Sequence, residues 1–105
     1  MVSRRLSWTI DRAHYPKASG HYILSEHAER RMYARGLGPP VIRRALRFGR
    51  VVFARGAAHF VLGKKEAARY DAVAPEDNGV QLVVSGLQDG TVVTLYRNRE
   101  TLPRA

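Results

Sequence analysis

Residues 80–98 read VQLVVSGLQDGTVVTLYRN, and this stretch decides the expected fold. Two largely apolar runs flank Asp89-Gly90, a dipeptide that favours a two-residue turn between antiparallel strands. The stretch therefore predicts a β-hairpin at the C-terminal end of the domain.

The two-residue turn also predicts which residues lie opposite each other in this hairpin. It pairs Ser85 with Thr94 and Val83 with Tyr96 on one face. Because the other face is entirely apolar, we expect it to pack against helices and to leave the first face free as a working surface. The apolar face would carry Leu82, Val84, Val93 and Leu95.

A second hairpin and two helices are expected before this unit. Residues 51–54 and 59–62 are apolar runs around a Gly-containing connection, which favours another pair of strands. Ser25 precedes a helical pattern that ends at Gly36, because serine caps helix starts and glycine adopts the left-handed conformation at helix ends. Two early prolines begin the next helix, which is expected over residues 39–48.

These elements predict an α+β fold with two N-terminal helices packed on one face of a four-stranded antiparallel sheet. Residues 63–70 contain good helix formers and are expected to add one or two helical turns. The expected organisation is a basic N-terminal arm over residues 1–20, a single domain over residues 21–100 and a tail over residues 101–105.

The composition limits the possible functions. A chain of 105 residues suits one domain with one modest core. The absence of cysteine excludes a disulfide framework and a thiolate metal cage, and it favours a reducing compartment. The N-terminal residues are basic, but no continuous apolar run follows them. We therefore expect neither a signal peptide nor a membrane span, and we expect a cytoplasmic location.

The charge points to a polyanionic partner. Lysine and arginine number 18 against 9 acidic residues, which gives a formal net charge of +9. Residues 1–55 hold twelve basic and three acidic residues, whereas residues 56–105 hold six of each, so the excess lies in the first half. Most of the basic residues are arginines, whose guanidinium groups bind phosphate in a bidentate manner and stack on bases. RNA is the expected partner, and an arginine-rich solvated surface is the alternative.

A ridge of basic residues is expected on the first helix. His27, Arg31 and Arg35 are spaced by four, so they lie in one row beside the inward-facing stripe. Like charges in such a row repel each other, which favours an anion lying across them. The outer face of the second helix would extend this basic surface through Arg43, Arg44, Arg47 and Arg50.

Cleavage of RNA without a metal ion requires a base for the 2′-hydroxyl, an acid for the leaving oxygen and cations around the phosphate. The candidate catalytic residues are His27 as a proton carrier, Arg31 at the phosphate and Tyr96 as a second hydrogen-bonding or stacking group. His59 is expected to be structural or on the surface. No metal site and no cofactor are expected, because the histidines lack a metal-binding spacing and no phosphate loop is present. Candidate substrate contacts are Arg35, Arg43, Arg47, Lys64, Lys65, Ser85, Thr94, Arg97 and Arg99.

Two short motifs carry a family resemblance. Residues 25–37, SEHAERRMYARGL, and residues 90–97, GTVVTLYR, resemble the motifs of a bacterial family of small domains that looks like a branch of the RelE/BrnT-type toxin fold. The resemblance covers about residues 21–100 and implies helices before an antiparallel sheet, metal-independent cleavage of RNA and a small acidic antitoxin as a partner. Its most characteristic positions correspond to His27, Ala28, Arg31, Arg35, Thr94 and Tyr96.

Two functions of other classes use the same residues. A non-catalytic RNA-binding module would bind phosphate with the arginines and stack a base on Tyr96. A protein-interaction domain would present the basic face to an acidic partner. Neither of these functions requires a second proton carrier.

Overall fold

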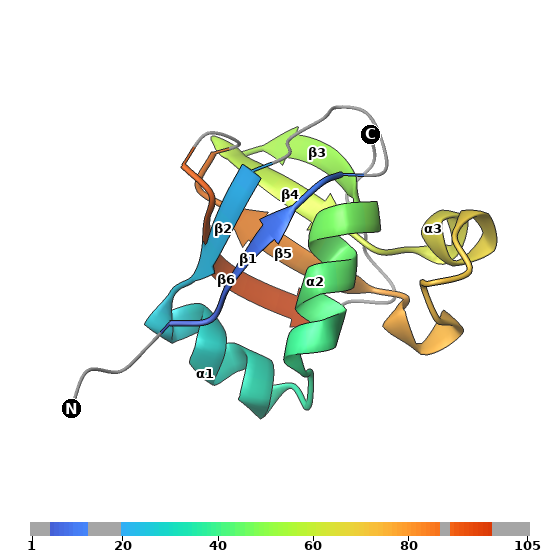
Figure 1. Cartoon of the computed structure of the whole chain (residues 1–105), viewed down its shortest axis with the longest axis horizontal. Coiled ribbons are helices and arrows are strands. Elements are labelled where there is room, and N and C mark those ends of the chain that lie inside the picture. The colour runs from blue at the N-terminus through green and yellow to red at the C-terminus, as the bar shows by residue number, and fades with distance from the viewer. Residues whose placement is uncertain (1–4, 13–19, 87–88, 98–105) are drawn as a thin grey trace.

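The described part of the chain forms one six-stranded sheet and three α-helices (Figure 1). The computed structural model describes residues 5–12, 20–86 and 89–97. The elements in chain order are β1 (Ser7–Ile10), β2 (Gly20–Leu24), α1 (Glu26–Ala34), α2 (Pro39–Phe48), β3 (Arg50–Ala54), β4 (Ala57–Val61), α3 (Lys64–Arg69), the 3-10 turn η1 (Pro75–Asp77), β5 (Val80–Val84) and β6 (Thr91–Arg97).

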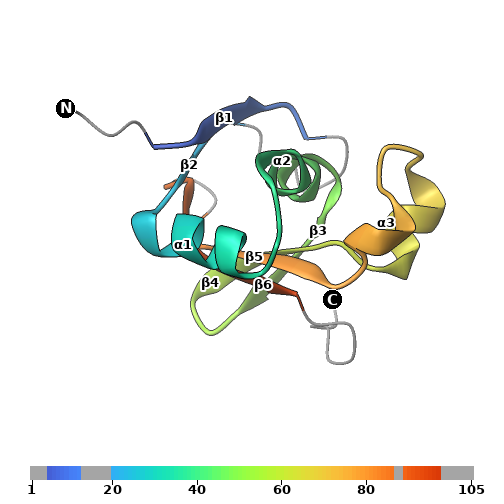
Figure 2. The same cartoon turned by 90° about the horizontal axis from the view of Figure 1, so that it is seen from below.

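The sheet is mixed and strongly curved. Its strand order is β1-β2-β6-β5-β4-β3, with β2 parallel to β6 and every other neighbouring pair antiparallel. Figure 2 shows α2 lying between β1 and β5, so the sheet curls around this helix. We call the side that holds α2 the inner face and the opposite side the outer face.

The expected four-stranded antiparallel sheet with two helices is therefore wrong. β3 to β6 lie where strands were expected, and α3 forms where residues 63–70 were expected to add one or two helical turns. However, β1 and β2 extend the sheet, and β2 runs parallel to β6. The two extra strands have only four and five residues, and β1 falls within the segment expected to be an arm. Their strand conformation depends on pairing with a segment remote in sequence, which a local pattern does not reveal.

The first helix begins and ends as its sequence predicts. The Ser25 hydroxyl accepts a hydrogen bond from the Ala28 N–H at 3.0 Å, which caps the start of α1. Gly36 has a φ of +67°, the left-handed conformation expected after the last turn. Ala28 and Met32 are fully buried, so the stripe between the polar residues packs against the core.

The second helix is held at its C-terminal end by a buried arginine. Arg12 donates to the carbonyl of Leu46 at 3.3 Å and to that of Gly49 at 2.5 Å, where the negative end of the helix dipole favours a cation. Its guanidinium lies 5.0 Å from the centre of the Phe60 ring. Burial lowers the pKa of Arg12 and raises the pKa of the neighbouring Tyr22.

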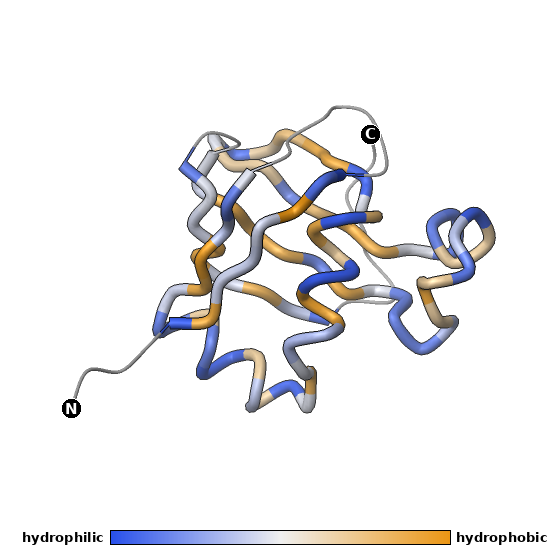
Figure 3. The backbone as a smooth tube through the Cα atoms, in the orientation of Figure 1, coloured by the Kyte–Doolittle hydropathy of each residue, from blue (hydrophilic) through white to orange (hydrophobic). Residues whose placement is uncertain are grey.

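The core lies between α2 and the inner face of the sheet. Figure 3 shows hydrophobic residues along the central strands and hydrophilic stretches on the helices. The helix contributes Ile42, Ala45 and Leu46, all fully buried, because they share one side of α2. The inner face of the strands contributes Phe60, Leu82, Val84, Val92 and Leu95.

The β3–β4 hairpin lies where the sequence predicts it, but its turn has two residues, whereas four residues were expected between the strands. Arg55 and Gly56 have φ values of 52° and 75°, as a two-residue turn of the primed type requires. The second strand begins at Ala57 and pairs Val52 with His59. A non-glycine residue in the left-handed region is uncommon, so Arg55 is an unusual residue for this turn.

The register expected for the β5–β6 hairpin is wrong by two residues. Thr94 lies opposite Val83 and not Ser85, and Tyr96 lies opposite Gln81. The turn is longer than the expected dipeptide, because the Ser85 N–H donates to the Thr91 carbonyl, with residues 86–90 between them.

A shift between Val83 and Val84 then pairs Val84 with Val92. As a result, Val92 replaces the expected Val93 in the buried face, and Val93 is half-buried.

Gly90 supplies the first test of this architecture. Gly90 has a φ of +72°. A Cβ atom at this residue would collide with the backbone of His21 in β2, next to the point where β2 pairs with β6. We expect Gly90→Ala to lower the free energy of unfolding by about 3 kcal/mol, the sum of backbone strain and overpacking. Urea unfolding followed by circular dichroism measures this value.

Gly36→Ala is the matched control for that variant. Gly36 has nearly the same φ, +67°, but no atom lies within 4 Å of its Cβ position. Its substitution should cost about 1 kcal/mol from backbone strain alone. Equal losses for the two variants would contradict the close contact between Gly90 and β2.

Candidate functional site

The predicted basic ridge lies on α1, and its three residues are held differently. His27 in the first turn and Arg35 at the C-terminal end are exposed. Within the described ranges, neither side chain has a hydrogen-bond or ion-pair partner in the protein. Arg31 is half-buried, and its Nε donates to the Leu95 carbonyl of β6 at 3.2 Å.

Arg31 takes this position because β6 has an open edge. β2 pairs with β6 only at Ile23–Thr91 and Leu24–Val92 before the chain turns into α1. The carbonyls beyond this point need other donors. The Ser25 hydroxyl donates to the Val93 carbonyl at 3.2 Å, and Arg31 supplies the next donor at Leu95. α1 thus lies beside β6 and replaces a missing strand (Figure 1).

Thr94 and Tyr96 point to the outer face of the sheet. They alternate along β6 with Leu95, which is fully buried on the inner face. Both side chains are half-buried. In the described part of the chain, no hydrogen bond joins Tyr96 to His27 or Arg31. The ridge and Tyr96 therefore lie on two sides of the same strand edge.

The outer face holds a polar chain that the sequence did not reveal. Gln81 Nε2 lies 2.8 Å from His59 Nδ1 and 3.1 Å from Tyr96 Oη, and both Gln81 and His59 are buried. The expected register placed Val83 opposite Tyr96, which hid the Gln81–Tyr96 pair. The available signal was a glutamine in an otherwise apolar strand, since a buried amide requires partners.

The basic face of α2 is largely occupied by internal contacts. Arg44 forms two hydrogen bonds with the buried Asp77, at 2.8 and 3.1 Å, and the hydrogen bond to Asp77 raises the pKa of Arg44. Arg47 donates to the Asp11 carbonyl at 2.7 Å. Arg43 is exposed and has no such contact with any described residue.

Arg50, at the start of β3, is also used within the fold. Its Nη1 lies 3.5 Å from a carboxylate oxygen of the buried Glu66 in α3. Glu66 also accepts a hydrogen bond from the Gly63 N–H at 2.8 Å, which caps the start of that helix. The pair therefore ties α3 to the edge of the sheet.

The remaining predicted contacts are spread over the molecule. Lys64 and Lys65 are exposed in the first turn of α3, at the end of the molecule opposite α1 (Figures 1 and 2). Ser85 is exposed and donates to the Asp89 carboxylate. Arg97 donates to the Glu76 carbonyl. Arg99 lies outside the described residues.

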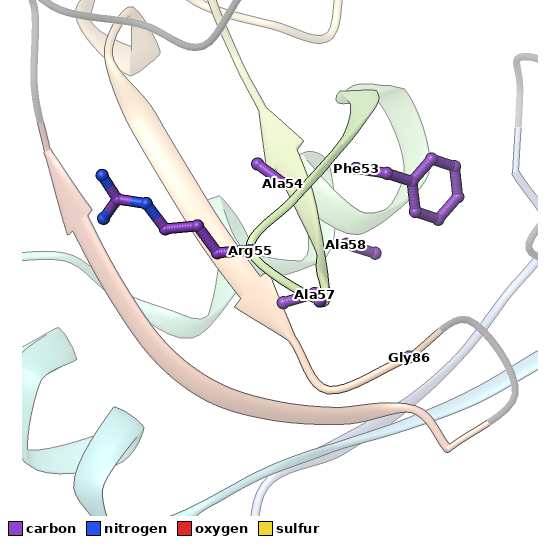
Figure 4. A pocket seen from close by; sticks show the side chains of 7 residues that line it. Phe53, Ala54, Arg55, Ala57, Ala58 and Gly86 are labelled. Carbon is purple, nitrogen blue, oxygen red and sulfur yellow. The ribbon is translucent and has the colours of Figure 1, made fainter.

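A separate hollow of about 440 Å³ lies at the tip of the β3–β4 hairpin. Its lining is mostly apolar and includes Phe53, Ala58 and Gly86, and none of the predicted site residues lines it. Figure 4 shows Phe53 and Arg55 pointing to opposite sides of the hairpin, so they do not converge on one ligand position.

Two further findings concern metal binding and membrane-spanning helices. Among the described residues, no three His, Asp or Glu side chains cluster so that they could hold a metal ion. In the same part of the chain, every helix is too short or too polar to cross a membrane.

Comparisons of the chain with protein-family models, curated proteins and solved structures gave no match. The resemblance to the RelE/BrnT-type fold therefore stays a prediction.

Two adjacent arginines of α2 provide a test of how the basic face is used. Arg44→Ala removes the partner of the buried Asp77, and we expect the free energy of unfolding to fall by about 2 kcal/mol. Arg43→Ala removes an exposed side chain and should change it by less than about 0.5 kcal/mol. Urea unfolding measures the free energy of unfolding of both variants. A similar loss in the two would contradict the structural role of Arg44 and the free surface position of Arg43.

Proposed function

We propose that this protein binds RNA through a basic surface formed by His27, Arg31, Arg35 and Arg43. The observation that carries this proposal is that Arg35 and Arg43 are exposed cations with no partner among the described residues, whereas Arg44 and Arg47 are engaged in internal contacts. Exposed guanidinium groups without an internal partner favour a ligand with repeated negative charges.

The arrangement of the two helices supports this surface. Arg35 caps the end of α1, and Pro39 begins α2 after a short connection, so Arg43 follows shortly after Arg35 along the helical half of the chain. Arg31 is fixed by its bond to Leu95, which reduces the side-chain entropy lost on binding. Guanidinium groups form paired hydrogen bonds with phosphate oxygens.

Metal-independent cleavage of the bound RNA is the reaction that we propose. His27 would accept the proton of a 2′-hydroxyl, whose oxygen attacks the adjacent phosphorus to form a 2′,3′-cyclic phosphate. The departing 5′-oxygen would take a proton from Tyr96, while Arg31 and Arg35 stabilise the charge on the phosphate. The exposure of His27 and the position of Arg31 one turn later support these roles.

One observation favours a second candidate, an RNA-binding module without catalysis. The Tyr96 side chain lies on the outer face, and no described contact connects it with His27. RNA held on the basic surface would then have one proton carrier beside it and not two. The cleavage assay separates the two functions.

Cleavage is tested by incubating structured and single-stranded RNA in EDTA with the wild-type protein and with His27→Ala. We expect wild-type cleavage to yield 2′,3′-cyclic phosphate ends and the variant to lose about 100-fold or more of the rate, as expected for a proton carrier. RNA that stays intact but is retained in a salt-sensitive manner would favour the binding module. A protein that neither cleaves nor retains RNA at low salt would contradict both functions.

The position of the surface is tested by the salt dependence of binding. For single-stranded nucleic acid, each phosphate contact contributes about 0.7 to the slope of log K against log salt. The double variant Arg35→Ala/Arg43→Ala should therefore reduce the slope by about 1.4. The matched control Lys64→Ala/Lys65→Ala removes the same charge at the other end of the molecule and should reduce it much less. Equal reductions would show a response to net charge alone.

A further inference from the structure

Three polar side chains from neighbouring strands form a hydrogen-bonded chain on the outer face. His59 comes from β4, Gln81 from β5 and Tyr96 from β6. Gln81 Nε2 is the central atom, 2.8 Å from His59 Nδ1 and 3.1 Å from Tyr96 Oη. His59 is 8% exposed and Gln81 is 3% exposed, whereas Tyr96 is half-buried. On this face the chain thus runs from a buried histidine to a side chain that solvent reaches.

The donor and acceptor roles follow from the chemistry of the amide. Nε2 carries two hydrogens, so it can donate one to His59 Nδ1 and one to Tyr96 Oη. Gln81 Oε1 is then a buried acceptor for which the described part of the chain supplies no partner. The reverse orientation would bury two unpartnered N–H donors, which costs more than one unpartnered acceptor. Neutral His59, with its proton on Nε2, therefore fixes the amide in the first orientation.

This orientation determines what the Tyr96 hydroxyl can do. Its oxygen accepts from Gln81, so its own hydrogen is left for an acceptor outside the chain of three. Tyr96 also follows Leu95, whose carbonyl binds Arg31, so the residue that carries the phenol is adjacent along β6 to the one that Arg31 contacts. A phosphate oxygen that lies across the edge of β6 is an acceptor of the right kind.

We propose that Gln81 and His59 are positioning residues, which hold the Tyr96 hydroxyl as a hydrogen-bond donor toward an RNA phosphate. This inference rests on the proposed RNA binding and adds to it a specific arrangement of protons.

The test measures binding of a 2′-O-methyl oligoribonucleotide, which cannot be cleaved, at pH 8. Tyr96→Phe should bind about tenfold more weakly, as expected for the loss of a hydrogen bond to a charged group. His59→Asn keeps an acceptor near the Nδ1 position and should match the wild type, whereas His59→Leu removes the acceptor and should weaken binding toward the level of Tyr96→Phe.

Equal affinities of His59→Asn and His59→Leu, or a Tyr96→Phe affinity equal to that of the wild type, would overturn the inference. Circular dichroism and thermal unfolding show whether each variant is folded.

A measurement without RNA separates this inference from the proposed function. Nitrogen-15 NMR of the ring nitrogens reports the tautomer of His59 directly, and we expect the proton on Nε2 at pH 8. A proton on Nδ1 would overturn the inference even if the protein binds RNA. If the tautomer is as expected but the wild type does not bind RNA at low salt, the proposed function fails, and with it the assignment of RNA to Tyr96.

Discussion

Two residue pairs, Ile23 with Thr91 and Leu24 with Val92, join the N-terminal strands to the C-terminal hairpin. This parallel contact is short, and it forms only because Gly90 lets the two backbones approach each other. It determines where the chain leaves the sheet, and therefore where α1 begins. Ser25, the next residue, both caps α1 and donates to the Val93 carbonyl. The position of the helix that carries the basic ridge thus depends on this junction.

The net charge of +9 proves to be a poor measure of the surface that could bind an anion. Buried or half-buried arginines satisfy carbonyls and carboxylates that the fold would otherwise leave without partners. Arg12 holds the end of α2, Arg44 fixes Asp77, and Arg50 pairs with Glu66. A guanidinium group suits these positions because its donors are spread over a rigid plane. Among the described residues, the exposed cations without an internal partner include Arg35 and Arg43 in the α1–α2 half, and also Arg55, Lys64 and Lys65 elsewhere on the molecule, so their distribution is more informative than the total.

Local signals predicted the helices well and the sheet only in part. Ser25, Gly36 and the prolines of α2 act through adjacent residues, so the sequence alone placed the boundaries of both helices correctly. β1 and β2 exist because of a partner far along the chain. The candidate site divides in the same way. Helical spacing in the sequence is enough to predict the ridge on α1. The His59–Gln81–Tyr96 chain depends instead on the register between β5 and β6, which the longer turn shifts by two residues.

The early departure of β2 from β6 also explains why two different surfaces meet. A strand that continued beside β6 would cover its edge and separate α1 from the outer face. Because β2 ends at Leu24, the described side chains that bond to the edge beyond Val92 are those of Ser25, which caps α1, and Arg31 of α1. Arg31 reaches the edge from one side, and Tyr96 projects from the next residue along β6 on the other. A flexible polyanion lying along this edge would contact the fixed guanidinium group of Arg31 and the oriented phenol of Tyr96 at adjacent positions of β6. Neither the basic ridge nor the outer face offers both groups alone.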